Sequence, residues 1–346
     1  MTGFACGLLI WVCLSPLSAH TLEDVRIALS APGKSHLDLS VGGADLNTVI
    51  PLTVIVGPNP GPTLLALAGI HGSEYSPIIA TQRLAQEVEA KSLSGSLILV
   101  HMANLPAYLG RTIYVSPVDQ KNLNRLFPGN PQGSLSERLA YTIAQELFPL
   151  ADAVMDLHSG DGNEQLLPSW TGYYARAGNA EVVERSRAMA MAFGIPHIVE
   201  FQWELTDSKL AIWAGSAAVA QGIPSIDVEA GGMGLYNTNA IAQITTGVRR
   251  VMAHLGMTTE RFDPLPNPIL VQQRESVKSP VDGSWVPRVD AGEIVRKGQI
   301  LGQVTDWHGQ VVFEAQSPVD GLLLIRLEAP PVREGETLVT VAVLPR

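Results

Sequence analysis

The sequence of 346 residues contains only two cysteines, Cys6 and Cys13, and both lie in its first segment. If this segment is removed, the mature chain has no cysteine and therefore no disulfide bond. Any metal ion bound by the mature chain must then be held by histidine and carboxylate side chains.

Charged residues are also scarce, since they make up 16% of the chain, and the net charge is −10. No run of lysine and arginine is present to neutralise phosphates, which argues against nucleic acid as a partner. The hydrophobic content of 46% is typical of a globular protein with a large core. Because single cores rarely exceed roughly 250–300 residues, the chain is long enough for two domains.

No apolar run in the sequence is long enough to span a bilayer. The run from Phe4 to Leu14 is too short, and the small residues Ser18 and Ala19 follow it. This pattern predicts a secretory signal peptide over residues 1–20, although no lysine or arginine precedes the run. A short N-terminal core helix is the alternative. Export would place the mature protein in the periplasm or outside the cell, and without it the protein would be cytoplasmic.

Apolar runs alternate with helical patterns in the first two thirds of the chain. This alternation predicts an α/β/α layered domain with a mixed, largely parallel sheet over residues 21–262. Ligands bind such sheets beyond the carboxyl ends of the strands. The predicted strands are Thr53–Val56, Thr63–Ile70, Leu97–Met102, Ala153–Leu157 and Ile223–Val228, and the predicted helices are Ile78–Glu89, Leu135–Phe148 and Ala180–Phe193.

The pattern changes after about Pro264. The Pro-rich segment within 263–274 predicts a linker, and short Val/Ile/Leu runs between Gly and Pro turns follow it. Residues 275–346 are therefore expected to form a small all-β, barrel-sandwich-like domain. The stretch Ser279–Gly283 (SPVDG) recurs as Ser317–Gly321, which indicates two related halves.

Histidines follow two of the predicted strands at their carboxyl ends. His71 and Glu74 lie in a Gly-containing bend after the strand at 63–70, and His158 closes the strand at 153–157. Each of them alone would suit an ordinary turn or strand end. Two histidines and one glutamate are, however, a common ligand set of catalytic zinc sites. We therefore predict one Zn²⁺ ion held by His71, Glu74 and His158, with Asp156 on the same strand face as His158 as a supporting carboxylate.

A polar loop between residues 119 and 129 carries further candidate binding groups. Arg125 can grip a carboxylate with two hydrogen bonds, and Asn124 can add an amide donor. Arg111 lies upstream as a second arginine. The alternative is a surface loop whose arginines form solvent-exposed ion pairs.

Two carboxylates end the predicted strand at 223–228. A zinc site that hydrolyses amides needs a base to take a proton from water and to pass it to the leaving amine. Glu229 is the candidate for this base, and Asp227 on the same strand face is its competitor. The alternative is a partly exposed carboxylate without a catalytic role.

Taken in order, these motifs resemble the succinylglutamate desuccinylase/aspartoacylase family of the zinc carboxypeptidase clan. The motifs are HGSE (71–74), Asn104-Leu-Pro106 with a downstream arginine, D-x-K-N-L-N-R-x-F-P-G (119–129), DLHSG (156–160) and VEAGG (228–232). The resemblance covers roughly residues 45–255. It implies that His71, Glu74 and His158 hold Zn²⁺ and that Glu229 is the general base and then acid. It also implies that Arg125 and Asn124 bind the substrate carboxylate and that Arg111 polarises the scissile carbonyl.

The C-terminal part is similar to the small β domain of some family members, which is related to biotinyl and lipoyl carrier domains. No lysine occurs in Thr305–Gln310, where a carrier lysine would be expected, so this domain is expected to be structural or to shape the mouth of the site.

We therefore expect a zinc-dependent hydrolase that cleaves the amide bond of an N-acyl amino acid or a similar small acylated amine. An exported zinc carboxypeptidase or amidase acting on peptides or cell-wall fragments is one alternative, and a catalytically inactive binding protein is another. The sequence does not fix the acyl group, and it leaves open whether the chain forms a homo-oligomer. Five aromatic residues are candidate pocket walls: Trp170, Tyr173, Tyr174, Trp203 and Tyr236.

Overall fold

The computed structural model describes residues 19–43, 47–205 and 208–344. Residues 1–18 of the predicted signal peptide lie outside the described residues. Its last two residues form the edge strand β1 (Ala19–His20), and Thr21 caps helix α1 (Leu22–Leu29) by accepting a hydrogen bond from the Asp24 N–H. Over the described ranges, no helix is long and apolar enough to cross a membrane.

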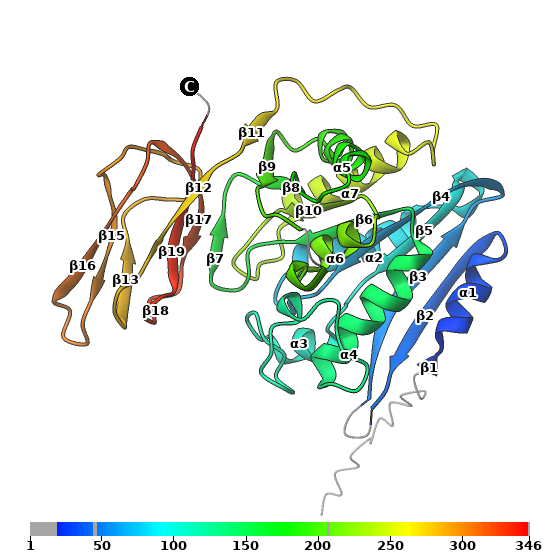
Figure 1. Cartoon of the computed structure of the whole chain (residues 1–346), viewed down its shortest axis with the longest axis horizontal. Helices are drawn as coiled ribbons and strands as arrows, with labels where there is room; N and C mark the ends of the chain where they lie inside the picture. Colours follow the sequence, from blue (N-terminus) through cyan, green and yellow to red (C-terminus); the bar gives the residue numbers. More distant parts are fainter. Residues whose placement is uncertain (1–18, 44–46, 206–207, 345–346) are drawn as a thin grey trace, which may run out of the picture.

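One ten-stranded sheet runs through the first domain in the order β1-β2-β3-β5-β4-β6-β10-β8-β9-β11 (Figure 1). Six of its nine neighbouring strand pairs are parallel and three are antiparallel, which confirms the predicted mixed, largely parallel sheet. All five predicted strands are present. The remaining bounds are β2 (Gly33–Val41), β3 (Thr48–Val56), β4 (Asn59–Ala68), β5 (Ser94–Val100), β6 (Ala153–His158), β8 (Trp170–Tyr174), β9 (His197–Phe201), β10 (Ser225–Glu229) and β11 (Ile269–Val271).

Helices cover both faces of this sheet because its central strands are apolar on both sides. On β4, Leu64 and Ala66 pack toward α2, α5 and α7, whereas Leu65 and Leu67 pack toward α4 and α6. The three predicted helices are present, and the third of them ends where it was predicted to end. Helix bounds are α2 (Tyr75–Glu87), α3 (Leu105–Gly110), α4 (Leu135–Tyr141), α5 (Ala180–Phe193), α6 (Ala214–Ala220) and α7 (Thr238–His254), and α4 continues into a π-helical turn, Thr142–Leu147.

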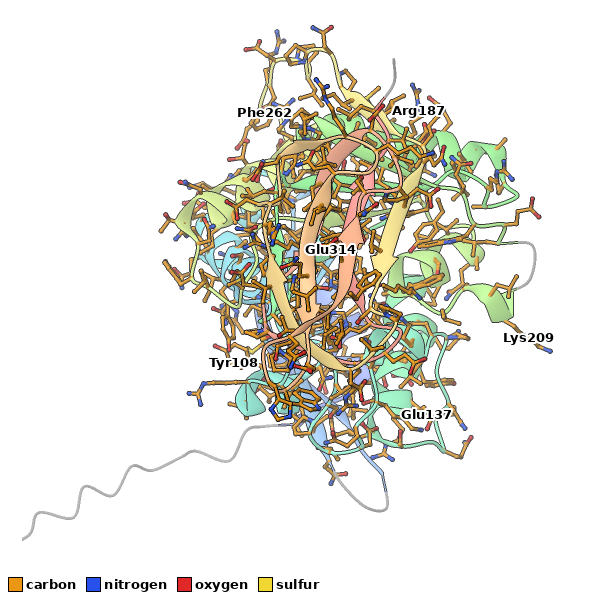
Figure 2. All side chains as sticks on the ribbon, turned by 90° about the vertical axis from the view of Figure 1, so that its left-hand side faces the viewer. Tyr108, Glu137, Arg187, Lys209, Phe262 and Glu314 are labelled. Carbon is orange, nitrogen blue, oxygen red and sulfur yellow. The ribbon has the colours of Figure 1, made fainter. Side chains whose placement is uncertain are left out.

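The C-terminal domain consists of two small antiparallel sheets packed around Trp285. Figure 2 views this domain from its outer side, with Glu314 of β16 turned toward the viewer. One sheet has the order β12-β19-β17-β14 and the other β16-β15-β13-β18. The bounds are β12 (Arg274–Lys278), β13 (Gly283–Pro287), β14 (Ile294–Val295), β15 (Ile300–Thr305), β16 (Val311–Gln316), β17 (Gly321–Leu327), β18 (Pro331–Val332) and β19 (Thr337–Ala342).

The repeated SPVDG segments make the same turn in the two halves of this domain. The Ser279 hydroxyl donates to the Val281 carbonyl at 2.6 Å, and the Ser317 hydroxyl donates to the Val319 carbonyl at 2.7 Å. The strands that start at the two repeats, β13 and β17, lie in different sheets. The repeat therefore marks two corresponding halves, as predicted.

The two domains are connected by strand pairing as well as by the chain between them. Strand β7 (Glu164–Leu166) leaves the first domain and pairs with β17 of the second, with Leu166 opposite Ile325. Strand β11 belongs to the large sheet, and β12 begins at Arg274, so the linker predicted over 263–274 is wrong in its second half. The run Ile269–Val271 is only three residues long, which is too short to give a strand pattern.

Candidate metal and catalytic site

A tight bend after β4 places His71 at the carboxyl edge of the sheet. Gly69 has φ 73°, a left-handed conformation that glycine adopts without steric cost. At Gly72, an added Cβ would lie about 2.0 Å from the Ala107 carbonyl carbon, so only glycine lets the bend approach α3. Helix α2 then starts at Tyr75, and the side chain of its N-cap residue, Glu74, makes no capping hydrogen bond. Glu74 is therefore free to turn into the site.

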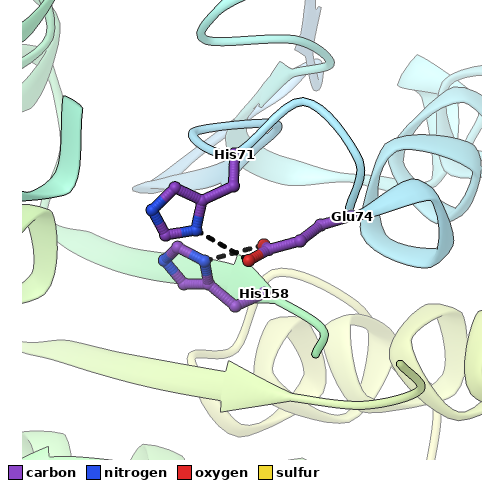
Figure 3. Close-up of side chains that lie close together, drawn as sticks. All are labelled: His71, Glu74 and His158. Atoms are coloured by element: carbon purple, nitrogen blue, oxygen red, sulfur yellow. Dashed lines mark hydrogen bonds and ion pairs between the residues drawn. The ribbon is translucent and has the colours of Figure 1, made fainter. Parts of the chain in front are cut away.

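The structure brings His71, Glu74 and His158 together (Figure 3). His71 Nδ1 lies 2.7 Å from Glu74 Oε1, and His158 Nδ1 lies 2.8 Å from Glu74 Oε2. Ligand atoms of all three residues lie within 4.8 Å of one another, and all three side chains are buried. Two imidazole nitrogens and a carboxylate thus point at one small volume, which suits a divalent metal ion.

The outer nitrogen of each imidazole is engaged on the side away from Glu74. His71 Nε2 lies 3.1 Å from Asn122 Oδ1. His158 Nε2 lies 3.1 Å from Asp156 Oδ1 and 3.3 Å from Asn124 Nδ2. At His71, the Asn122 acceptor keeps the proton on Nε2 and leaves Nδ1 free as a ligand atom. At His158, Asp156 lies on the predicted side of the ring at ion-pair distance, although neither of its oxygens makes a hydrogen bond among the described residues.

The charges within the cluster favour an ionised Glu74 and protonated histidines. Burial by itself would raise the pKa of Glu74, but His158 and His71 outweigh it and lower that pKa to about 2. Burial would lower the pKa of His158, but Asp156 and Glu74 raise it well above its ordinary value. Each histidine proton here compensates the Glu74 charge. Binding of a divalent metal would displace these protons.

Glu229 lies beside the cluster on the neighbouring strand, directly opposite His158 in the register of β10 and β6. Its Oε2 atom is buried and has no hydrogen-bond partner among the described residues. Burial raises the pKa of Glu229 well above its usual range, against the opposing charge of His158. In its competitor Asp227, Oδ2 accepts a hydrogen bond of 2.9 Å from the Tyr174 hydroxyl, whereas Oδ1, like Glu229 Oε2, has no hydrogen-bond partner among the described residues.

The two predicted arginines have different positions. Arg125 lines the same pocket as His71, Glu74 and His158. Its guanidinium lies 5.8 Å from the centre of the Trp213 ring and donates a hydrogen bond of 2.7 Å to the Asn124 carbonyl. Asn124 is buried, and its Oδ1 accepts a hydrogen bond from the Ala214 N–H. Arg111 is exposed in a left-handed conformation after α3 and does not line this pocket. The structure therefore does not bring Arg111 to the other site residues, and its role stays a prediction.

Comparison with known proteins identifies the family of this site. Residues 60–255 match the model of the succinylglutamate desuccinylase/aspartoacylase catalytic domain. The chain belongs to the succinylglutamate desuccinylase/aspartoacylase family. It is 32% identical over 312 residues to an N-α-acetyl-L-2,4-diaminobutyric acid deacetylase of Halomonas elongata, and the match covers 88% of each protein.

Solved structures of relatives share the fold over nearly the whole chain. A succinylglutamate desuccinylase from Silicibacter sp. superimposes with a TM-score of 0.82 at 26% identity, over 92% of this chain and 97% of the other. A product-bound ectoine utilization protein from Ruegeria pomeroyi gives a TM-score of 0.82 at 29% identity, over 91% and 96%. Family membership makes this protein an amidohydrolase that acts on an acylated amine, as the sequence predicted.

The family motifs account for only part of the pocket wall, which encloses about 240 Å³. Of the predicted aromatic walls, Trp170, Tyr174 and Trp203 line the pocket, whereas Tyr173 and Tyr236 do not. Lining residues that sequence reasoning missed are Tyr114, Asn122, Glu164, Trp213 and Arg274. Asn122 belongs to the Asp119–Gly129 motif, so the sequence could have indicated it as a pocket residue. Nothing in the sequence indicated Arg274, because it belongs to the other domain.

Proposed function

We propose that this amidohydrolase is a zinc-dependent deacylase of small N-acyl amino acids. The observation that carries the proposal is one pocket lined by a three-residue metal-ligand cluster, an accessible guanidinium and a carboxylate oxygen that has no hydrogen-bond partner among the described residues. These are the groups that amide hydrolysis requires, because a water must be activated, a proton moved and a substrate held in position.

The cluster fits Zn²⁺ by the chemistry of its donors. Two imidazole nitrogens and one carboxylate form a common catalytic zinc set, and each outer nitrogen lies 3.1 Å from a side-chain oxygen, of Asn122 at His71 and of Asp156 at His158. Zn²⁺ held by His71, Glu74 and His158 would supply Lewis acidity, which lowers the pKa of water and polarises a carbonyl. The same donors suit other divalent ions, so the native metal is part of the proposal.

Glu229 would move the proton. In this mechanism it takes a proton from the attacking water, whose oxygen bonds to the scissile carbonyl carbon. The C–N bond then breaks, and Glu229 passes the proton to the leaving nitrogen, giving a carboxylate and a free amine. A carboxyl group with a pKa raised by burial can both accept and return a proton. A nearby divalent cation would draw this pKa down again toward the working range.

Arg125 would hold the carboxylate of the substrate, with its planar fork of donors facing the pocket. Its stacking on Trp213 leaves the edges of the guanidinium for a ligand. Asn124 would act mainly by positioning, because its two side-chain polar atoms contact His158 and the Ala214 N–H.

The size of the cavity around the ligand cluster favours a short acyl group. Its volume of about 240 Å³ falls below the usual range for drug-sized ligands, whereas an adjoining cavity of about 1110 Å³ shares its residues Arg125, Trp203, Trp213, Arg274 and Ile325. The Halomonas elongata relative is by name an acetyl-amino acid deacetylase, which supports a short acyl group here.

An assay of the zinc-loaded protein against a panel of N-acetyl and N-succinyl amino acids tests this function. We expect release of free amine from at least one of them, and none from short unblocked peptides. Turnover of the peptides alone would support the carboxypeptidase alternative. Absence of turnover on every compound, with zinc bound stoichiometrically, would overturn the proposal.

A further inference from the structure

A tight turn after α3 holds Tyr114 in an unusual backbone conformation. The Thr112 N–H donates to the Ala107 carbonyl at 3.2 Å, and the Thr112 hydroxyl donates to the Val115 carbonyl at 2.6 Å. Within this turn, Tyr114 has φ 58°, a left-handed conformation that is uncommon for a bulky side chain. Such a conformation persists only where the surrounding structure holds it, and it is frequent at active sites and ligand clamps.

A buried carboxylate fastens this turn to the bend that carries two of the candidate metal ligands. Asp161 Oδ2 accepts a hydrogen bond of 2.7 Å from the Tyr114 N–H, and Asp161 Oδ1 accepts one from the Ser73 hydroxyl. Asp161 is fully buried, and Ser73 lies between His71 and Glu74 in the chain. The backbone of Tyr114 therefore has a fixed position relative to the metal-ligand cluster.

The side chain of Tyr114 lines the catalytic pocket beside this cluster. Its ring centre lies 6.2 Å from that of His71, at an interplanar angle of 88°. Its hydroxyl is hydrogen-bonded to Glu164, which begins β7 and lines the same pocket. Burial, together with the charge of Glu164, raises the pKa of Tyr114 well above its ordinary value, so the hydroxyl stays protonated. Tyr114 thus places a neutral hydrogen-bond donor next to a candidate metal ligand.

Four other candidate donors are less suited to a scissile carbonyl oxygen, which gains negative charge when water attacks it. The two arginines of the pocket, Arg125 and Arg274, lie over rings of its aromatic wall. The side chain of Tyr174 is buried, and its hydroxyl donates to another carboxylate at 2.9 Å. Arg111 is exposed and does not line the pocket. Tyr114, by comparison, is only half-buried and contacts a candidate metal ligand.

We propose that Tyr114 is a catalytic residue that donates a hydrogen bond to the scissile carbonyl oxygen, the role that the family resemblance implies for Arg111. This inference rests on the proposed deacylase function and deepens it. As the water oxygen bonds to the carbonyl carbon, the C=O electron pair moves to the oxygen, and the hydroxyl turns from Glu164 to donate to it. The hydroxyl keeps its proton throughout. Because the charge exists mainly in the transition state, the hydrogen bond should raise kcat more than it lowers KM.

The variant Y114F tests this role, because it removes only the hydroxyl oxygen. Kinetics are measured on the zinc-loaded protein with the substrate of highest kcat/KM in the panel of N-acetyl and N-succinyl amino acids. We expect kcat to fall by about 10²–10³-fold, the usual cost of losing one such donor, while KM stays within a few-fold. Zinc content should remain stoichiometric, which shows that the fold and the ligand cluster are intact.

Inhibitor binding separates a catalytic role from a structural one. The probe is a phosphonamidate analogue of the same substrate, in which a tetrahedral phosphorus replaces the acyl carbonyl carbon. In Y114F, its inhibition constant should rise in proportion to the loss of kcat/KM, whereas inhibition by the product amino acid should change little. A hydroxyl that only supports the shape of the pocket would weaken both inhibitors alike.

Y108F is the matched control for this variant. Tyr108 lies on α3 and is labelled in Figure 2. It is also half-buried, its ring lies 5.9 Å from that of Tyr75, and it does not line the pocket. Its kinetics and its affinity for the phosphonamidate should equal those of the wild type. R111Q is the competing variant, and its loss of kcat should be smaller than that of Y114F.

Three results would overturn the inference: a kcat of Y114F within a few-fold of the wild type, equal weakening of analogue and product in Y114F, or a greater loss of kcat in R111Q. All three require a wild-type enzyme that turns over acyl amino acids. A wild type that is inactive on every compound would instead contradict the proposed function itself, so the two failures are distinguishable.

Discussion

Asn122 Oδ1 lies 3.1 Å from His71 Nε2, on the opposite side of the imidazole ring from Glu74. This contact fixes the ring orientation and the proton position that metal binding needs. We therefore expect N122A to lower the affinity for Zn²⁺ by about 10- to 100-fold, as is typical for residues that support a metal ligand. Competition with a chromogenic chelator measures the change.

The variant N122D keeps the acceptor oxygen and should restore most of that affinity. N130A is a matched control, because Asn130 is exposed in the same loop region and contacts neither histidine. Unchanged affinity in N122A would show that the orientation of His71 comes from elsewhere.

Removal of the metal should abolish activity and lower stability. Zinc that binds the folded state but not the unfolded state stabilises the fold by mass action. The thermal midpoint of unfolding should therefore rise with the concentration of free Zn²⁺. H158A should lose both this response and stoichiometric zinc. H101Q is the control, since His101 also follows a sheet strand, β5, but contacts Thr53 and Thr81. Equal zinc content in H158A and the wild type would rule out the ligand set.

Replacement of Glu229 should separate chemistry from metal binding. We expect E229Q to retain zinc but to lose about 10²–10⁴-fold in kcat, the usual contribution of a general base. D227N should stay within a few-fold of the wild type, because Asp227 is tied to the Tyr174 hydroxyl. Steady-state kinetics with metal analysis of each variant decides between the two carboxylates. Near-normal turnover by E229Q would assign the base elsewhere.

Protonation of His101 should destabilise the fold in mild acid. Burial, helped by the charge of His36, lowers the pKa of His101 to about 4, whereas an unfolded chain has its ordinary value of 6.5. The unfolded state therefore binds more protons between these values, and stability falls as the pH drops from 6.5 toward 4. The full effect is on the order of 3 kcal/mol.

Urea unfolding of the metal-free protein from about pH 4.5 to about pH 7 measures this dependence. H101Q cannot take up the proton and should show a flatter curve than the wild type. Because other groups titrate equally in both proteins, identical curves would show that His101 does not contribute.

The candidate metal site was predictable from sequence because it depends on strand ends. Strands β4 and β6 are parallel neighbours in which Ala68 faces Leu157, so His71 and His158 emerge at the same edge. Glu229 follows from the same rule, since β10 lies beside β6. His101 shows the limit of that rule: it also follows a strand, but its ring turns toward two threonines inside the fold.

The remaining site residues depend on contacts that no local pattern encodes. Asn122 contacts His71 because a long loop returns to the end of β4. Arg274 lines the pocket because the C-terminal domain packs against the first domain. Short strands such as β7 and β11 give no periodicity, although they determine how that domain is attached.

The pairing of β7 with β17 couples the unfolding of the two domains. A protein cut after residue 262 would expose the backbone donors and acceptors of β7 and would invite association through that edge. It would also open the pocket on the side of Arg274. The two halves are therefore expected to melt in one cooperative transition, and loss of activity in a shortened chain would reflect misassembly rather than missing chemistry.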